Sequence, residues 1–235
     1  MEFKHETLLK KLEKIEQALL IVKKKNFFVR KKENPLRESA SFFIFDYLMN
    51  LEKPKKIQHR VWARNKVCIT LLRHFGLRAS DIREITMFKL KNGIKTGTMQ
   101  IAQPKTKKQR VIVFTDSAIS DLQKIEQELK IAFGYQLDRP LAYSIVTGKL
   151  IPCRKWVNQL NLFIKLANKK FAGIFTSHSF RINYVRKLLK ILPIQQVQSI
   201  VGHKDISTTK RYDRFRPDAS KMKEIITKAL NEKIE

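Results

Sequence analysis

Apolar residues recur every three to four positions through most of this chain, and one short segment departs from that spacing. Between Gly97 and Phe114 the order changes to two β-prone stretches, Met99-Gln-Ile-Ala and Arg110-Val-Ile-Val-Phe, separated by Pro104-Lys-Thr-Lys-Lys. Helical spacing predicts amphipathic helices, whereas two β-prone stretches around a turn predict a hairpin. We therefore expect an α+β fold that is mainly α with a small antiparallel β-sheet, whose ribbon has a lysine-rich tip.

Turn and cap signals divide the helical part of the chain. Gly76 stands where a left-handed glycine ends a helix, and Ser80 and Asp81 suit the N-cap and first position of the next one. Arg78 is then held in a short connection between helices. The helices are expected at residues 39–51, 59–75, 118–133, 155–168, 177–192, 194–201, 207–215 and 218–232.

A basic stretch at residues 23–32 leads to Asn34-Pro35, where we expect a domain boundary. Residues 1–35 are expected to form a basic amphipathic helix and a linker. The apolar stripe of that helix fits packing on its own domain or a short coiled coil. Residues 36–235 are expected to form the main domain, and its last helix, 218–232, has one apolar face.

The charge balance indicates a polyanionic partner. The chain has 49 Lys and Arg against 21 Asp and Glu, a formal net charge of +28, and the excess is spread along its length. A folded basic body of this kind fits nucleic acid, although a ribosomal protein or a protein that binds anionic membranes would also be basic.

Other composition features exclude several classes of protein. Cys68 and Cys153 are the two cysteines, and neither lies in a CxxC motif or beside a histidine cluster, which argues against a disulfide scaffold and a zinc site. The apolar runs are much shorter than the ~20 residues of a membrane span. Acidic residues near the start, such as Glu2 and Glu6, argue against a targeting peptide, so the protein is expected to be intracellular.

Four short features occur in an order that could supply chemistry. They are Phe75-Gly-Leu-Arg-Ala-Ser-Asp81, Lys105 at the ribbon tip, His178-Ser-Phe-Arg181, and the stretch from Val201 through Gly202-His203 to Tyr212. Taken singly, each has a plain structural interpretation as a surface charge, a helix stop or a packed tyrosine. Their joint occurrence in a basic chain is what favours a site.

Local geometry suggests how these residues would be presented. His178 and Arg181 are three positions apart and so share a helix face, while Phe180, Tyr184 and Leu188 form the buried face. A left-handed Gly202 would end its helix and turn His203 outward. Ser207 suits the N-cap of a short helix that carries Tyr212.

Together these motifs resemble the tyrosine recombinase (phage integrase) family, over roughly residues 36–230. The stretch from Thr176 to Tyr212, with the tyrosine nine residues after His203, is the most specific part. The resemblance implies the catalytic-domain fold of that family. It also implies six catalytic residues: Arg78, Lys105, His178, Arg181, His203 and Tyr212.

The resemblance further implies a mechanism in which Tyr212 attacks a DNA phosphate and forms a 3′-phosphotyrosyl bond with release of a 5′-hydroxyl. Fixed guanidiniums of Arg78 and Arg181 would match the charge that gathers on the non-bridging oxygens. His203 would donate a further hydrogen bond, and His178 would help to accept the tyrosine proton. Nearby positive charge favours the phenolate form of a tyrosine.

Several supporting roles follow from the same resemblance. Lys105 would protonate the departing oxygen, and Asp81 would orient Arg78 without touching the substrate. Lys107, Lys108 and Arg110 are expected to bind DNA. No metal, ATP or organic cofactor is required. The expected partner is double-stranded DNA and not a membrane. A homotetramer is expected on paired sites, and the free protein could be a monomer. The protein is expected to be intracellular with DNA, in a bacterial or archaeal cytoplasm, a virus-infected host or an organelle.

The sequence departs from the family pattern in three places. Only residues 1–35 precede the catalytic pattern, where family members usually have a DNA-clamping core-binding domain. We hypothesise that the N-terminal helix pairs with a partner or another subunit to compensate. Phe180 stands where leucine is usual, and Pro104 where glycine often precedes the lysine. The terminal helix 218–232 fits either an interface with a neighbouring subunit or internal packing.

Site-specific recombination or integration is the leading interpretation, and two alternatives remain open. A DNA-binding protein descended from such an enzyme could hold a site without cutting it. A type IB topoisomerase-like protein would relax DNA with related chemistry and without an assembled tetramer. The intact set of six residues argues against the binding-only alternative, because binding alone has no use for both histidines and the nucleophile.

Overall fold

The computed structural model describes residues 39–102, 109–134, 136–171 and 173–213. The expectations for residues 1–35, for Lys105, Lys107 and Lys108, and for helix 218–232 lie outside these residues. None of the described helices is both long and apolar enough to cross a bilayer.

Helix α3 (His59–Phe75) is the central element, and its middle is buried on all sides. The helix ends where expected, because Gly76 adopts a left-handed conformation with φ of 54°. The ring of Tyr184 also occupies the space that a Cβ at Gly76 would need, so glycine is required there for two reasons. Among the described helices, those that contact α3 most extensively are α2 (Phe42–Asn50), α4 (Ala79–Ile82), α6 (Asp116–Lys124), α7 (Glu126–Phe133), α8 (Cys153–Lys170) and α9 (Ser177–Leu188).

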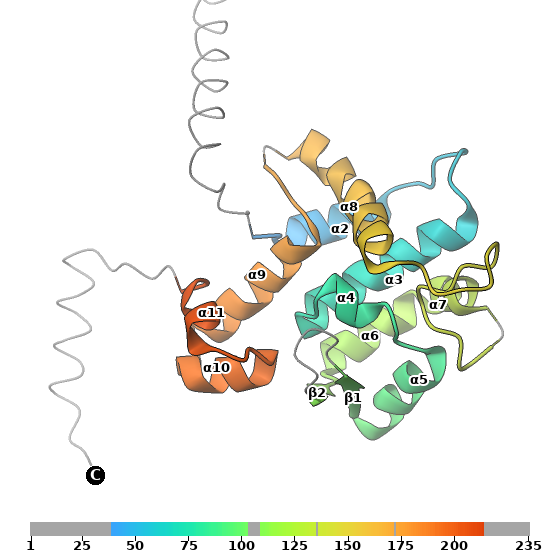
Figure 1. Cartoon of the computed structure of the whole chain (residues 1–235). Helices are drawn as coiled ribbons and strands as arrows, with labels where there is room; N and C mark the ends of the chain where they lie inside the picture. The colour runs from blue at the N-terminus through green and yellow to red at the C-terminus, as the bar shows by residue number, and fades with distance from the viewer. Residues whose placement is uncertain (1–38, 103–108, 135, 172, 214–235) are drawn as a thin grey trace, which may run out of the picture. The chain divides into compact units, whose positions relative to one another are not determined.

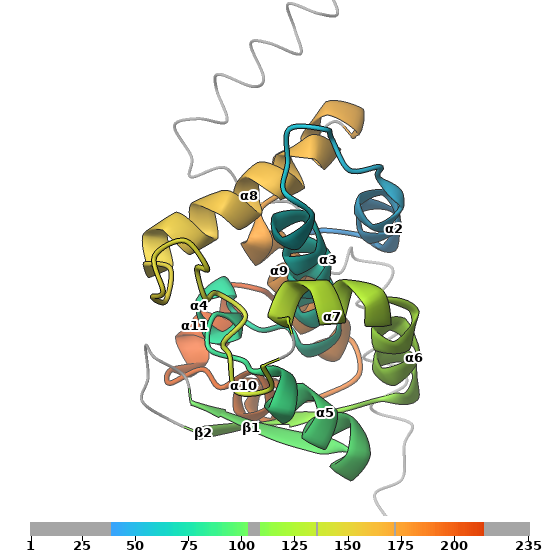
Figure 2. The same cartoon turned by 90° about the vertical axis from the view of Figure 1, so that its right-hand side faces the viewer.

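The expected ribbon is present. Strands β1 (Thr98–Ala102) and β2 (Gln109–Val113) pair antiparallel, with Gln100 opposite Val111. Alternate residues of each strand are buried, which is the period-2 pattern expected of a strand with one covered face. Helix α5 (Met87–Thr96) runs beside the ribbon in Figure 2 and contacts β1.

Several helices differ from the sequence-based expectation: α9 ends at Leu188 and α11 at Lys210, before the expected 192 and 215, and two differences concern whole helices. Helix α5 was not expected, because Gly93 in its interior weakens the helical signal. The ring of Phe114 lies where a Cβ of Gly93 would be, which explains the glycine. The single helix expected at 118–133 is two helices, α6 and α7, which meet at a non-helical Ile125.

The last three described helices form the part of the fold that carries the expected nucleophile. Helix α9 leads from the region of α3 to α10 (Ile194–Val201) and α11 (Ile206–Lys210), as Figure 1 shows. Their apolar side chains form a cluster separate from the main core, made of Ile182, Val185, Val197, Val201 and Tyr212. Tyr212 is thus packed into its own small core.

Candidate active site

Arg78 and Asp81 form a compact unit at the start of α4. Arg78 is the N-cap, whereas Ser80 was expected there, and Asp81 is the third helical residue. The Asp81 carboxylate accepts the backbone N–H of Arg78 at 3.1 Å and lies 3.8 Å from its guanidinium. Asp81 is buried, and the Arg78 Nη1 atom is buried without a hydrogen-bond partner. The carboxylate therefore holds Arg78 in place and leaves part of its donor capacity unused.

Helix α8 donates or accepts a hydrogen bond next to two of the residues expected to be catalytic. The Trp156 indole donates to the carbonyl of Ala79 at 2.7 Å, directly after Arg78. The Asn161 amide oxygen accepts the backbone N–H of Ser177 at 2.8 Å, directly before His178. Neither contact has a local signal in the sequence, because each joins residues far apart along the chain.

Arg181 lies deeper than expected. It is 1% exposed, so it belongs to the interior rather than to an open helix face opposite Phe180. Its guanidinium donates to the carbonyls of Gly76 and Val201. Burial lowers the pKa of Arg181 to about 10, and the neighbouring Arg78 and Arg110 guanidiniums act in the same direction.

His203 is buried rather than turned outward. Gly202 is left-handed, as expected, but His203 is held inside by a 2.9 Å contact between its Nδ1 atom and the Thr209 hydroxyl. Its ring stacks on Tyr212, with centroids 5.6 Å apart and an angle of 16°. Burial lowers the pKa of His203 to about 3, and the charge of Arg181 acts in the same direction. Thr209 was missed by the sequence analysis, where Thr-Thr read only as part of a helix.

Tyr212 follows α11 and does not lie in it. Asp205, not Ser207, caps this short helix by accepting the Ser207 backbone N–H at 2.8 Å. The Tyr212 hydroxyl lies 3.2 Å from His178 Nε2, within reach for proton transfer to a neutral imidazole. The side chain is 9% exposed.

Arg110 is not on the surface, where a DNA contact was expected. It is 5% exposed and donates to the carbonyls of Ile200 and Phe75, both at 2.8 Å. The sequence misled here because β2 alternates, and position 110 falls on its buried side. Arg110 is therefore an interior residue of the site, and not one of the surface residues expected to bind DNA.

The five expected catalytic residues that the structure describes converge on one place. Three guanidiniums, those of Arg78, Arg110 and Arg181, influence one another, and the carboxylate of Asp81 opposes them. Positive charge exceeds negative charge in this cluster, which suits an anion with several oxygens. The cluster combines a hydroxyl nucleophile, a nearby base and fixed cationic donors, a combination that supports attack on a phosphodiester.

Sequence comparisons show which proteins this chain is similar to. Residues 45–218 match the model of the phage integrase family. The tyrosine recombinase XerC of Rickettsia prowazekii is 28% identical over 206 residues, which cover 84% of this chain and 63% of that protein. XerC of Rickettsia massiliae is 28% identical over 175 residues, 72% of this chain and 53% of that protein. The chain thus spans less than two thirds of the length of these relatives.

Solved structures share the fold. The Tn1549 transposon integrase in complex with a circular intermediate DNA has a TM-score of 0.58 at 17% identity and is matched over 81% of this chain and 66% of that one. XerH bound to difH substrate has a TM-score of 0.55 at 19% identity, over 81% and 52% of the two chains. The expected fold, mainly α with a small antiparallel sheet, is confirmed. Because the family model covers well over half of the sequence, the chain belongs to the phage integrase family.

Proposed function

We propose that this protein is a site-specific tyrosine recombinase or integrase that cleaves and rejoins DNA strands. The observation that carries the proposal is the Tyr212 hydroxyl, 3.2 Å from His178 Nε2, near the half-buried Arg78 and the buried Arg181. Cationic donors of this kind stabilise the charge that develops on a phosphate under attack. The XerC relatives and the DNA-bound structures of similar fold support the same activity.

In the proposed reaction the Tyr212 oxygen bonds to phosphorus while its proton passes to His178 Nε2. The bond from phosphorus to the 5′-oxygen breaks, and that oxygen takes a proton, for which Lys105 is the proposed donor. Arg78, Arg181 and His203 hold the non-bridging oxygens. Attack by a 5′-hydroxyl reverses the steps and restores the strand, so the phosphodiester bond energy is kept in the phosphotyrosine.

The partners are part of the proposal. Double-stranded DNA is the substrate, and strand exchange requires four subunits on paired sites. The protein is proposed to act inside the cell, where its DNA is. Residues 1–35 are proposed to pair with a partner or another subunit that completes the grip on DNA. Deletion of residues 1–35 should then reduce the size of the protein–DNA complexes in analytical ultracentrifugation, and an unchanged size would contradict this role.

The test is capture of a covalent adduct. Purified protein is incubated with a pool of nicked duplexes of randomised core sequence, denatured with SDS, and the protein-linked DNA is recovered and sequenced. Wild type should enrich one sequence, and Tyr212→Phe should capture none, because it lacks the attacking oxygen. Tyr47→Phe, in α2 where the ring packs on Phe171, is the matched control and should behave as wild type.

The proposal would be contradicted if wild type formed no adduct with any duplex of the pool. It would also be contradicted if Tyr212→Phe still formed adducts. Adducts accompanied by plasmid relaxation and no exchange between two copies of the selected site would favour topoisomerase-like activity instead.

A further inference from the structure

Two arginines join the same two helix ends. Arg110 donates from Nε to the carbonyl of Ile200 and from Nη2 to that of Phe75. Arg181 donates to the carbonyl that follows each of these in the sequence, that of Gly76 after Phe75 and that of Val201 after Ile200. We call the two guanidiniums and these four carbonyls the arginine bridge.

The acceptors are chemically suited to this role. Phe75 and Val201 are the last residues of α3 and α10, each followed by a left-handed glycine. Carbonyls at a helix C-terminus lack helical partners and carry the negative end of the helix dipole. A planar guanidinium with donors on separate nitrogens can satisfy two such carbonyls from different helices at once.

The bridge lies next to two catalytic residues. Arg78 follows Gly76 by two positions, and His203 follows Val201 by two positions. Building on the proposed function, we propose that Arg110 is a positioning residue: with Arg181 it sets the separation of the segments that carry Arg78 and His203, so that both reach one phosphate. Arg110 does not contact the DNA in this role.

The charge of Arg110 fits the same role. Burial is the main cause that lowers the pKa of His203 and of Arg181, and the positive charge of Arg110 acts in the same direction on both. Its third nitrogen, Nη1, is buried without a hydrogen-bond partner. A lysine would keep the positive charge, but its donors radiate from a single nitrogen and would not reproduce the spacing of the Nε and Nη2 atoms that reach the two carbonyls.

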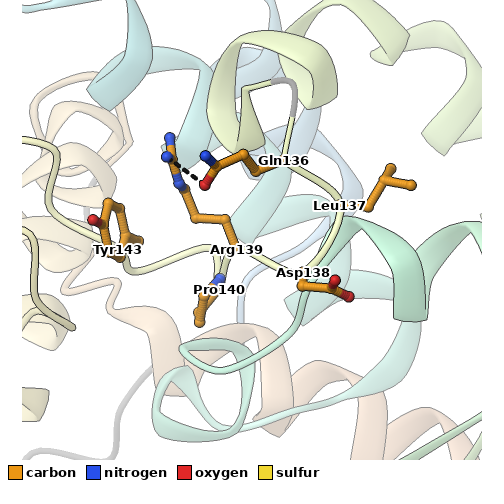
Figure 3. Close-up of a pocket in the computed structure, with 6 residues that line it drawn as sticks. All are labelled: Gln136, Leu137, Asp138, Arg139, Pro140 and Tyr143. Carbon is orange, nitrogen blue, oxygen red and sulfur yellow. Dashed lines mark hydrogen bonds between the residues drawn. The ribbon is translucent and has the colours of Figure 1, made fainter.

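The opposite end of α3 offers a matched control. Arg60 donates from Nε to the carbonyl of Ala132 at 3.0 Å and from Nη1 to that of Tyr143 at 2.8 Å, and its Nη2 is likewise buried without a partner. Figure 3 shows Tyr143 in the loop pocket there, beside Arg139. Arg60 is about 22 Å from Phe75 along the helix at 1.5 Å per residue. It makes the same kind of bridge far from the catalytic residues.

The first measurement needs no DNA. Side-chain ¹⁵N NMR of His203 in the free protein reports its surroundings, with spectra compared for wild type, Arg110→Ala, Arg110→Lys and Arg60→Ala. Both Arg110 variants should shift the His203 resonances, and Arg110→Ala should also raise the His203 pKa. Arg60→Ala should leave both unchanged. Wild-type His203 resonances in Arg110→Ala would overturn the proposal, whether or not the protein cleaves DNA.

The second measurement is the single-turnover rate of adduct formation on the selected nicked duplex, alongside the Kd for the same duplex. Arg110→Ala and Arg110→Lys should each lower the rate about 100-fold with a change in Kd below about threefold, as expected when transition-state contacts are lost. Arg60→Ala should stay within about threefold of wild type in both. Equal rate losses in Arg60→Ala and Arg110→Ala would reduce the role to general stability and overturn the proposal.

Arg110 could instead act by placing Lys105, which precedes β2 in the sequence. A modified substrate separates this alternative from the positioning of Arg78 and His203. A 5′-bridging phosphorothiolate has a sulfur leaving group that departs without a proton. It should restore cleavage to Lys105→Ala but not to Arg110→Ala. Restored cleavage by Arg110→Ala would mean that Arg110 acts through Lys105, and it would overturn the proposal. If Arg110→Ala does not fold, the same comparisons with Arg110→Lys decide the question.

Discussion

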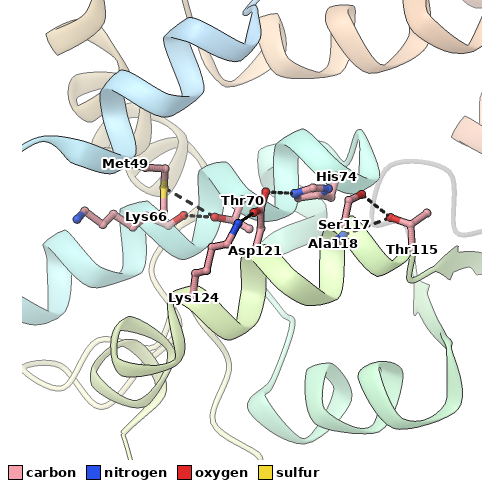
Figure 4. A network of polar contacts seen from close by, with 9 residues as sticks. All are labelled: Met49, Lys66, Thr70, His74, Thr115, Ser117, Ala118, Asp121 and Lys124. Carbon is pink, nitrogen blue, oxygen red and sulfur yellow. Dashed lines mark hydrogen bonds and ion pairs between the residues drawn. The ribbon is translucent and has the colours of Figure 1, made fainter.

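Two histidines have opposite surroundings: the half-buried His74 lies beside a carboxylate, and the buried His203 lies among guanidiniums. His74 Nε2 lies 2.9 Å from Asp121, and Lys124 donates to the other oxygen of that carboxylate at 3.0 Å. Figure 4 shows this network between α3 and α6. Burial lowers the pKa of His74, but the hydrogen bond and charge of Asp121 act against that shift. The network contains its own counter-charges.

The cluster around His203 does not balance its charges in this way. Burial and three arginines all lower its pKa, and Arg78 and Arg110 each keep a buried nitrogen without a hydrogen-bond partner. Unpaired buried donors cost stability unless something satisfies them. The Asp121 network is therefore balanced within the fold, whereas the His203 cluster keeps an excess of positive charge that suits an anion.

The largest expected effect comes from removing the residue most deeply buried in the cluster. Arg181→Ala leaves the carbonyls of Gly76 and Val201 without donors and should lower the free energy of unfolding by about 3 kcal/mol. Adduct formation should fall at least about 10³-fold, since a transition-state donor is lost. Urea unfolding and the covalent-capture assay check the two effects. A fully active and stable variant would contradict the contrast between the two regions.

The second effect is on pH dependence. The pKa of His203 is about 3 in the folded protein, well below the 6.5 of an ordinary histidine. As pH falls below 6.5, the unfolded chain binds a proton at His203 that the folded protein does not, and stability is therefore lost. From pH 6.5 to 4.5 this should remove about 2 to 3 kcal/mol, at about 1.4 kcal/mol per unit. His203→Asn should flatten the slope in urea unfolding. His74→Asn should flatten the slope less, because Asp121 opposes the lowering of the His74 pKa. Equal changes of slope in the two variants would contradict the difference between the two regions.

A third, smaller effect should follow from supplying an anion. Sulfate at about ten times its Kd should stabilise wild type by about 1.4 kcal/mol through binding. Sodium chloride of equal ionic strength is one control. Arg78→Ala is the other, because it should retain only the general stabilisation that sulfate gives to any protein. The same sulfate response in Arg78→Ala and wild type, measured by thermal unfolding, would show that the cluster does not bind the anion.

The smallest effect should come from the balanced network. Asp121→Asn should cost about 1 kcal/mol in urea unfolding, since it weakens hydrogen bonds that are only partly buried. Adduct formation should be unchanged within about twofold. Burial acts to raise the pKa of Asp121, but hydrogen bonds from Lys124 and His74 outweigh it and the pKa is lowered. This contribution is therefore present above the unfolded pKa and is lost as pH falls through the folded value. A large loss of cleavage in Asp121→Asn would show that the Asp121 network and the His203 cluster are coupled, and it would contradict the comparison.

The sequence by itself determined the features that arise from neighbouring residues. The spacing of apolar side chains predicted α3, α9, α10 and the ribbon, and Gly76 and Gly202 predicted the left-handed helix ends that the structure confirms. These signals can be read from the sequence because they depend on residues within one or two helical turns. That residues of separate motifs would meet was implied by the resemblance to the tyrosine recombinase family and not by local spacing.

Only the tertiary structure decided how deeply those side chains lie and what holds them. Arg110 looked like one more basic residue among 49, yet it lies inside and bonds to carbonyls 35 and 90 positions away. The supports from Trp156 to Ala79 and from Asn161 to Ser177 join distant segments in the same way. The physical reason is that a guanidinium or an amide finds its acceptors in space. Which carbonyls are near depends on how whole helices pack, which no local pattern records.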